Sequence, residues 1–196
     1  LGLMLEEDLL RRDFSLNAIA LTLGEKSRII DPANGLRALR AKTLFAISEK
    51  NLIDDPLRLL RALRFKAQFD FDIASQTIDW IKSNQPLLEN VAPERIQSEI
   101  LKLVSSPWAD DSIALLRKFG ILKTWLRQEK LSVKRAESLN NAKNFTKQEL
   151  SDALPLYRLT CLLSEMGLEH LRFSKHQRSV CKLLRKWQAL NDGQAF

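Results

Sequence analysis

The stretch Asp54–Phe65 combines two carboxylates with regularly spaced arginines, a pattern that can recognise a polar ligand. Asp54 and Asp55 precede Pro56, which suits the first turn of a helix because its missing N–H has no partner there. Asp54 is a favourable N-cap, and both acids complement the positive end of a helix dipole. The sequence therefore predicts a helix that begins at Asp54 and presents its arginines on one broad face. These arginines lie three residues apart, at Arg58, Arg61 and Arg64.

Asp55 and Arg58 are three residues apart, so a helix places an acceptor-only group beside a donor-only group. The Watson–Crick edges of cytosine and adenine present an amino donor next to a ring-nitrogen acceptor, whereas uracil and guanine reverse that order. A rigid Asp–Arg pair would accept C and A, and would lose roughly 1–3 kcal/mol per unpaired group against U and G. The flanking arginines could hold phosphates. The alternative is a surface helix stabilised by ordinary acid–arginine pairs, and the pattern alone leaves both interpretations open.

A second polar group lies near the start of the chain. It comprises Arg11, Arg12, Asp13 and Asn17. The apolar residues that follow predict a helix from Asp13 onward. A helix N-terminus beside arginines suits phosphates, and Asp and Asn side chains can bond sugar hydroxyls. An N-cap with a charged first turn explains the same residues equally well.

Positive charge is concentrated in the C-terminal part of the chain. Residues 1–110 contain 15 Lys/Arg and 16 Asp/Glu, whereas residues 111–196 contain 16 Lys/Arg and 8 Asp/Glu, so the net charge of +7 comes from the second part. A basic, helical half favours a polyanionic partner, most simply nucleic acid. A solubilising surface is the alternative that composition leaves open.

The chain reads as mainly α. Only six glycines in 196 residues and few β-branched runs favour helices, although residues 19–31 predict a hairpin with a glycine-containing turn. The Asp-Pro-Ala-Asn-Gly segment at 31–35 predicts a hinge. A short helix or a turn is expected at 35–41, and helices are expected at about 74–84, 93–105, 110–119, 132–143, 146–164 and 174–191.

Several function classes find no support in the sequence. Cys161 and Cys181 are twenty residues apart without a CxxC motif, which favours free thiols in a reducing compartment over a metal site. His170 and His176 are isolated, and no Ser/His/Asp arrangement or glycine-rich phosphate loop is found. No apolar stretch approaches the roughly 20 residues that span a bilayer, and no signal-peptide pattern opens the chain. We expect no metal ligands in this chain and a cytoplasmic location.

Three sequence blocks together resemble the class II tRNA nucleotidyltransferase and bacterial poly(A) polymerase family. Residues 11–17 match its RRDxxxN block, residues 31–36 its DP-x-x-G hinge block, and residues 54–58 its E/D-D-x-x-R block. The segment Ala92–Glu99 is a weaker fourth match. Block order and separation agree with the family over about residues 6–125, although the family more often has Glu where Asp54 stands.

The resemblance implies a role for each matching position. Asp55 and Arg58 would read the base, and Asp54 would orient that pair. Arg61 and Arg64 would lie towards the phosphates or sugar. Further contacts to phosphate and ribose would come from the RRDxxxN block, namely from Arg11, Arg12, Asp13 and Asn17. Family members add C and A to tRNA 3′ ends, or poly(A) tails, using CTP or ATP and Mg²⁺.

The resemblance also implies a domain organisation. Residues 1–44 would be the C-terminal remnant of a nucleotidyltransferase head with its hinge, residues 45–106 a helical neck with the base-reading helix, and residues 107–196 a basic helical body and the start of a tail. The metal-binding carboxylates of the family lie on a head strand before the RRD block. We therefore expect a fragment that selects a nucleotide and binds tRNA but is inactive alone. The alternatives are a catalytically silent RNA-binding module, a poly(A) polymerase fragment, and a helical adaptor.

Overall fold

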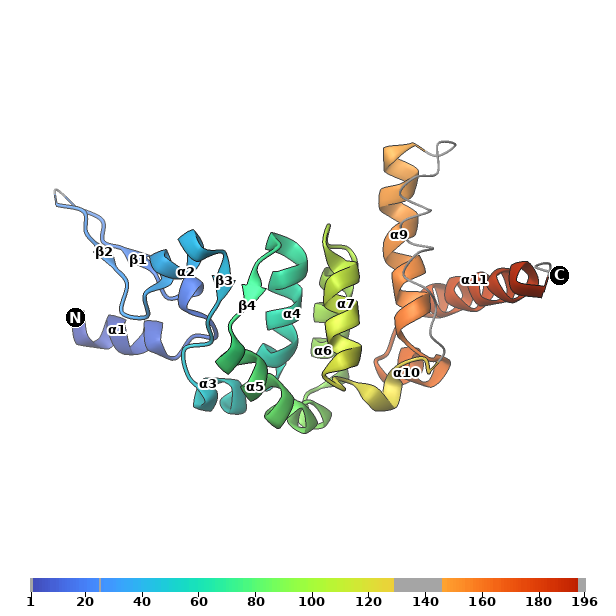
Figure 1. The fold of residues 1–196 in the computed structure, drawn as a ribbon, viewed down its shortest axis with the longest axis horizontal. Helices are drawn as coiled ribbons and strands as arrows, with labels where there is room; N and C mark the ends of the chain where they lie inside the picture. The colour runs from blue at the N-terminus through green and yellow to red at the C-terminus, as the bar shows by residue number, and fades with distance from the viewer. Residues whose placement is uncertain (1, 25, 129–145, 194–196) are drawn as a thin grey trace.

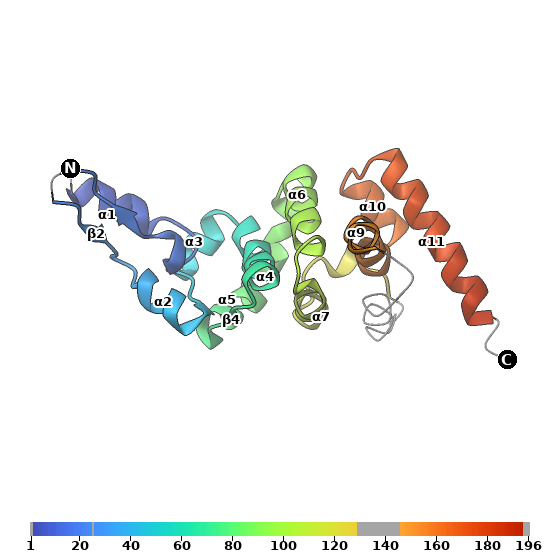
Figure 2. The same cartoon turned by 90° about the horizontal axis from the view of Figure 1, so that it is seen from above.

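A computed structural model describes residues 2–24, 26–128 and 146–193, and these residues confirm the predicted mainly α class. The elements follow one another in a row, with the two termini at opposite ends of the molecule (Figures 1 and 2). The α-helices are α1 (Gly2–Leu10), α2 (Gly35–Ala41), α3 (Glu49–Asp54), α4 (Leu57–Phe69), α5 (Ser75–Asn84), α6 (Pro93–Val104), α7 (Ala109–Lys118), α9 (Lys147–Leu162), α10 (Glu165–His170) and α11 (Lys175–Gly193). The 3₁₀ helices are Ser15–Asn17, Gln85–Asn90 and Lys123–Trp125.

Two small sheets accompany these helices. Strands β1 (Ala20–Leu21) and β2 (Ile29–Ile30) pair antiparallel, with Ala20 opposite Ile30, which confirms the predicted hairpin. Strands β3 (Thr43–Leu44) and β4 (Asp72–Ile73) pair in parallel, although they flank α3 and α4 in the sequence. The second pairing fixes the two ends of the α3–α4 segment relative to each other.

Helix α4 is the centre of the fold. Its apolar residues recur at helical spacing, and Leu59, Leu60, Leu63 and Ala67 are completely buried. This face packs against α6 and α7, where Ile100 belongs to the same core (Figure 1). The buried face holds α4 in place, and its partly exposed face remains available for polar groups.

The start of this central helix differs from the prediction. Asp54 is the last residue of α3 and is exposed, so it does not cap the following helix. Asp55 has an extended backbone between the two helices, and α4 begins at Leu57, directly after Pro56. The prediction failed because the sequence before the acids forms its own short helix, whose N-cap Ser48 accepts a hydrogen bond from the Asn51 backbone N–H.

A helix from Asp13 onward was also a wrong prediction. Helix α1 lies before this segment, and only Ser15–Asn17 turns as a 3₁₀ helix after it. Phe14 is instead extended and completely buried, and it bridges to Ala46. A buried aromatic contact with a distant strand has thus outweighed local helical propensity.

The other predicted helices that fall on described residues are confirmed, whereas α1, α3 and α10 were not anticipated. The helix expected at 132–143 lies outside the described residues. Helices α3 and α10 have only six residues each, too few for a clear periodic pattern. None of the helices in the described part of the chain is long and apolar enough to cross a membrane.

A buried arginine connects the C-terminal helices to the centre. Arg158 of α9 donates to both carboxylate oxygens of Asp110 at 3.0 and 2.8 Å, and to the carbonyls of Val104 and Ser106 at 3.0 Å each. Its side chain is only 4% exposed. These bonds satisfy a charge that would otherwise be costly to bury, and they join α9 to α6 and α7.

Candidate functional site

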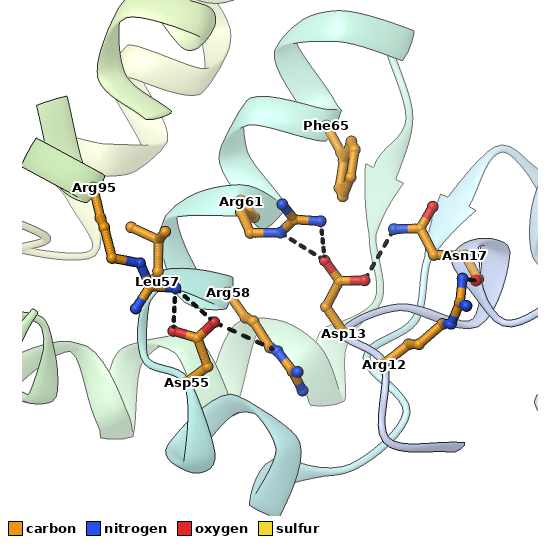
Figure 3. A pocket seen from close by; sticks show the side chains of 9 residues that line it. All are labelled: Arg12, Asp13, Asn17, Asp55, Leu57, Arg58, Arg61, Phe65 and Arg95. Carbon is orange, nitrogen blue, oxygen red and sulfur yellow. Dashed lines mark hydrogen bonds and ion pairs between the residues drawn. The ribbon is translucent and has the colours of Figure 1, made fainter. Parts of the chain in front are cut away.

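A cavity of about 480 Å³ lies beside the N-terminal half of α4, between the segment that follows α1 and the start of α6 (Figure 3). Six of the nine predicted site residues line it, drawn from two blocks more than 35 residues apart in the sequence. The lining residues are Arg12, Asp13, Asn17, Asp55, Leu57, Arg58, Arg61, Phe65 and Arg95. Four arginines against two carboxylates make this cavity suitable for an anionic ligand such as a phosphate ester.

Asp13 is the anchor of one side of the cavity. Its Oδ1 accepts the Phe14 backbone N–H and the Asn17 side-chain amide, each at 2.9 Å. Its Oδ2 accepts a hydrogen bond from Arg61 Nε at 2.7 Å and forms an ion pair with Arg61 Nη2 at 2.7 Å (Figure 3). A carboxylate has about four acceptor positions, and three hydrogen bonds and this ion pair engage both Asp13 oxygens. Asp13 therefore orients Arg61 and Asn17, and those two side chains retain groups for a ligand.

Core packing sets the position of Asp13. The neighbouring Phe14 is completely buried and meets the Phe65 ring edge-on, with centroids 5.6 Å apart. The Asp13 carbonyl accepts the Ile47 N–H at 3.1 Å, and Ser15 N–H donates to the Phe45 carbonyl at 3.0 Å. The segment after α1 is thereby fixed against both α4 and the segment between β3 and α3.

Asp55 and Arg58 lie side by side at the other end of the cavity. Arg58 Nε and Asp55 Oδ2 are 4.0 Å apart, which is too far for a hydrogen bond. Arg58 Nη1 donates instead to the carbonyls of Arg11 at 2.8 Å and Asn51 at 3.0 Å. A guanidinium has five N–H donors, so Nε and Nη2 remain for a ligand. The acceptor and the donor are thus held next to each other without saturating each other.

Two further residues that support this pair were missed from the sequence. Asn51 donates its side-chain amide to the carbonyls of Leu10 and Arg12, each at 2.7 Å, which ties α3 to the segment after α1. Arg95 Nη2 donates to both oxygens of Asp55 at 3.1 and 3.0 Å (Figure 3). The weaker fourth sequence block contains Arg95 and was the available signal, whereas Asn51 has none.

The remaining three predicted residues do not line the cavity. Arg11 contributes its backbone carbonyl to Arg58, and Asp54 is exposed at the end of α3. Arg64 Nε lies 3.0 Å from Glu99 Oε2 in an ion pair that joins α4 to α6, and both side chains are largely buried. Burial lowers the pKa of Arg64, and Glu99 opposes that shift. The three arginines of α4 thus reach three different partners.

Metal-ligating side chains are scattered over the described residues. Within residues 2–24, 26–128 and 146–193, no group of three or more His, Cys, Asp or Glu side chains lies together. Cys161 and Cys181 are free thiols whose pKa values burial raises. The cavity therefore offers an anionic ligand several N–H donors and the adjacent acceptor and donor of Asp55 and Arg58. The described residues contain no assembled set of metal ligands.

The fold and the site together define a helical protein with an arginine-lined cavity, in which an acceptor–donor pair lies opposite an anchored Asn and Arg. Two family models match the sequence. Residues 3–45 match the model described as the poly A polymerase head domain. Residues 70–130 match the model described as a probable RNA and SrmB-binding site of polymerase A. Together these matches cover more than half of the chain.

Known proteins give the same assignment. A CC-adding tRNA nucleotidyltransferase from Synechocystis sp. is 31% identical over 97% of this chain and 50% of its own length. A CCA-adding enzyme from Limosilactobacillus reuteri is 35% identical over 96% of this chain and 43% of its own length. The crystal structure of a Bacillus stearothermophilus CCA-adding enzyme in complex with CTP is similar with a TM-score of 0.68 at 31% identity, over 96% of this chain and 47% of that one.

This chain belongs to the family of tRNA nucleotidyltransferases and bacterial poly(A) polymerases, as its three sequence blocks predicted. The chain spans about half the length of the curated relatives it matches.

Proposed function

We propose that the cavity binds a nucleoside triphosphate and selects cytosine or adenine for addition to the 3′ end of a tRNA. The observation that carries this proposal is the pair of Asp55 and Arg58, open to a ligand in the same cavity as three further arginines. Asp55 would accept the amino group of C or A, and Arg58 would donate to the ring nitrogen. Uracil and guanine place a carbonyl against the carboxylate and an N–H against the guanidinium, which leaves both unpaired.

The opposite side of the cavity would hold the sugar and the phosphates. Arg61 keeps Nη1 for an anion because Asp13 engages its Nε and Nη2. Asn17 keeps its side-chain carbonyl for a ribose hydroxyl because its amide donates to Asp13. Arg12 would add a second phosphate contact. Its Nη1 donates to the Asn17 backbone carbonyl at 3.0 Å. Asp13 would act through its neighbours, since both of its oxygens are engaged.

The resemblance implies Mg²⁺ for nucleotidyl transfer. The ion would neutralise charge on the reacting phosphates. The described residues do not fit such a site, because none of their His, Cys, Asp and Glu side chains form a group of three or more. We therefore assign them no magnesium ligand. Their proposed contribution is the choice and orientation of the nucleotide.

The RNA partner would bind the basic part of the chain. Residues 111–196 carry twice as many Lys/Arg as Asp/Glu. The proposed action on tRNA implies a cytoplasmic location. Phosphate contacts release counterions, so affinity should fall linearly with salt on a log–log scale. Titration of a tRNA lacking its 3′ end with the full chain at 50 to 200 mM salt measures that slope. A flat salt dependence, or no binding at the lowest salt, would contradict the assignment of a polyanionic partner.

Nucleotide selection is tested by equilibrium binding of CTP, ATP, UTP and GTP to the full chain. We expect CTP and ATP to bind more tightly than UTP and GTP by at least about 10-fold, because Asp55 and Arg58 both lose a hydrogen-bond partner and water compensates part of that loss at these partly exposed side chains. Arg58→Ala should remove that preference. Arg37→Ala is the matched control, because Arg37 is an exposed arginine of α2 that does not line the cavity. Equal preference in wild type and the Arg58 variant would refute the base-reading role.

A poly(A) polymerase is the second candidate, and the descriptions of both matching family models favour it. Asp55 and Arg58 accept C and A by the same geometry, so the pair alone does not separate the two activities. The binding experiment does: ATP bound much more tightly than CTP supports the polymerase, and similar affinities support the tRNA nucleotidyltransferase.

A further inference from the structure

Arg95 lies in the weaker fourth sequence block, from which no role for it was predicted. It lies in the first turn of α6, about 40 residues from Asp55 in the sequence, and its Nη2 bridges the two Asp55 oxygens at 3.1 and 3.0 Å. It lines the same cavity as Arg58 (Figure 3). Asp55 thus lies between two arginines. Arg95 forms the hydrogen bonds, whereas Arg58, only three residues away in the sequence, lies 4.0 Å from Asp55 Oδ2.

This arrangement keeps the base-reading pair open. A carboxylate and a guanidinium three residues apart would ordinarily close to a hydrogen-bonded pair at about 2.7–2.9 Å. Such a pair would satisfy its own donor and acceptor and would present neither to a base. Here Arg95 holds the carboxylate of Asp55 from one side, while the carbonyls of Arg11 and Asn51 hold Arg58 from the other. The separation between Asp55 and Arg58 is the result of these opposing contacts.

We propose that Arg95 is a specificity-determining positioning residue, which keeps Asp55 apart from Arg58 so that the two can read a base together. The proposal rests on the proposed base selection and adds a third residue to it. Arg95 need not leave when a base binds. A carboxylate offers about four acceptor positions, and Arg95 uses one on each oxygen.

The start of α6 is fixed well enough for this role. Pro93 is its first residue and sets a helical φ without losing a hydrogen bond. Glu94 pairs with the Arg172 side chain, and the Gln97 side-chain amide donates to the Arg172 carbonyl at 2.9 Å. The first turn of α6 therefore contacts the segment between α10 and α11 on one side and Asp55 on the other. An exposed arginine can position a partner only from a backbone held in this way.

The test compares Arg95→Gln with Arg95→Lys in the full chain, with equilibrium binding of CTP, ATP, UTP and GTP as the readout. In Arg95→Gln we expect Asp55 to close onto Arg58, so affinity for CTP and ATP falls and their preference over UTP and GTP drops by about 10-fold. A single nitrogen makes the contact in the structure, so the lysine variant should recover most of that preference. Arg37→Gln removes the same charge from an exposed position of α2 outside the cavity and should leave the preference unchanged.

Two results would overturn the proposal. One is an unchanged preference in a folded Arg95→Gln variant, with folding checked by circular dichroism. The other is tighter CTP binding in that variant, which would make Arg95 a competitor of the base. If wild type prefers C and A but Arg95→Gln is unaffected, only this proposal fails. If wild type has no preference at all, the proposed function fails as well, so the two failures are distinguishable.

Discussion

Replacement of Asp13 by Asn tests whether this carboxylate anchors the site. The Asp13 side chain is 6% exposed, accepts three hydrogen bonds, and forms an ion pair with Arg61 Nη2 as its fourth contact. Asn has a similar shape but offers one acceptor oxygen and one donor nitrogen. Whichever way the amide points, its nitrogen faces two donors, either those of Arg61 or those of Phe14 and Asn17. The substitution therefore loses two of the four contacts and leaves Arg61 without its counter-charge.

The magnitude follows from the two contacts with Arg61, both at 2.7 Å. Hydrogen bonds to charged groups contribute about 1.5–3 kcal/mol each. Because the Arg61 side chain is 31% exposed, water recovers part of that loss, and we expect the free energy of unfolding to fall by about 2 kcal/mol. For a chain of this size that lowers the Tm by about 4–8 °C. CTP affinity should fall too, because Arg61 and Asn17 lose their orientation.

Thermal unfolding by circular dichroism measures the change in Tm. Asp72→Asn is the matched control: it makes the same chemical change at a side chain that is 91% exposed and lies 4.0 Å from Lys66. Surface ion pairs contribute about 0–1 kcal/mol, which corresponds to about 0–4 °C in Tm, and a pair at 4.0 Å should lie at the lower end of that range. An Asp13→Asn variant that melts with wild type, or a control that loses as much, would refute the assignment of Asp13 as an anchor.

Three further predictions follow from buried groups. Arg158→Met should lower the free energy of unfolding by about 3–5 kcal/mol, because it leaves Asp110 and two buried carbonyls without a donor; urea unfolding followed by circular dichroism measures the loss. Gly35→Ala places a Cβ against the Ser15 carbonyl and should weaken CTP binding through the shifted turn, as an affinity titration would show. Burial raises the pKa of the Cys161 thiol, so iodoacetamide at pH 8 should alkylate it more slowly in the folded chain than in urea.

The pH dependence of stability follows from the same thiol. Because the folded pKa of Cys161 lies above the unfolded one, its contribution to stability is complete below the unfolded pKa and is lost as pH rises through the folded pKa. Cys181 shifts in the same direction for the same reason. Urea unfolding between pH 7 and pH 10 should therefore show stability declining at the alkaline end, and Cys161→Ser should reduce that decline. An identical alkaline decline in the variant would exclude the thiol as its cause.

The sequence by itself determined the family, the mainly α class and the composition of the cavity. The RRDxxxN and D-D-x-x-R blocks name five of its lining residues, and the arginine spacing after the second block adds Arg61, because residue type and spacing can be read from the sequence alone. Helical periodicity also located most of the described helices. Candidate site residues that recur at short, fixed spacing can therefore be identified from the sequence without a structure. The nucleotide-binding roles of these residues and the domain boundaries at 44 and 106 stay predictions.

Tertiary structure decided how those residues are arranged. Asp54 is not an N-cap because α3 ends there, and Asp13 is not in a helix because Phe14 is buried against Phe65. Neither contact is visible at short range, since each depends on which distant segments meet.

The pair Asp55 and Arg58 shows most clearly which features the sequence predicts and which depend on the tertiary structure. Their spacing in sequence predicted a donor beside an acceptor, but an isolated helix would allow the two charges to neutralise each other. What holds them 4.0 Å apart is Arg95 on one side and two backbone carbonyls on the other, all supplied by other segments of the chain. The sequence thus determined which two groups lie next to each other in the cavity, and only the fold decided that they stay too far apart to hydrogen-bond to each other.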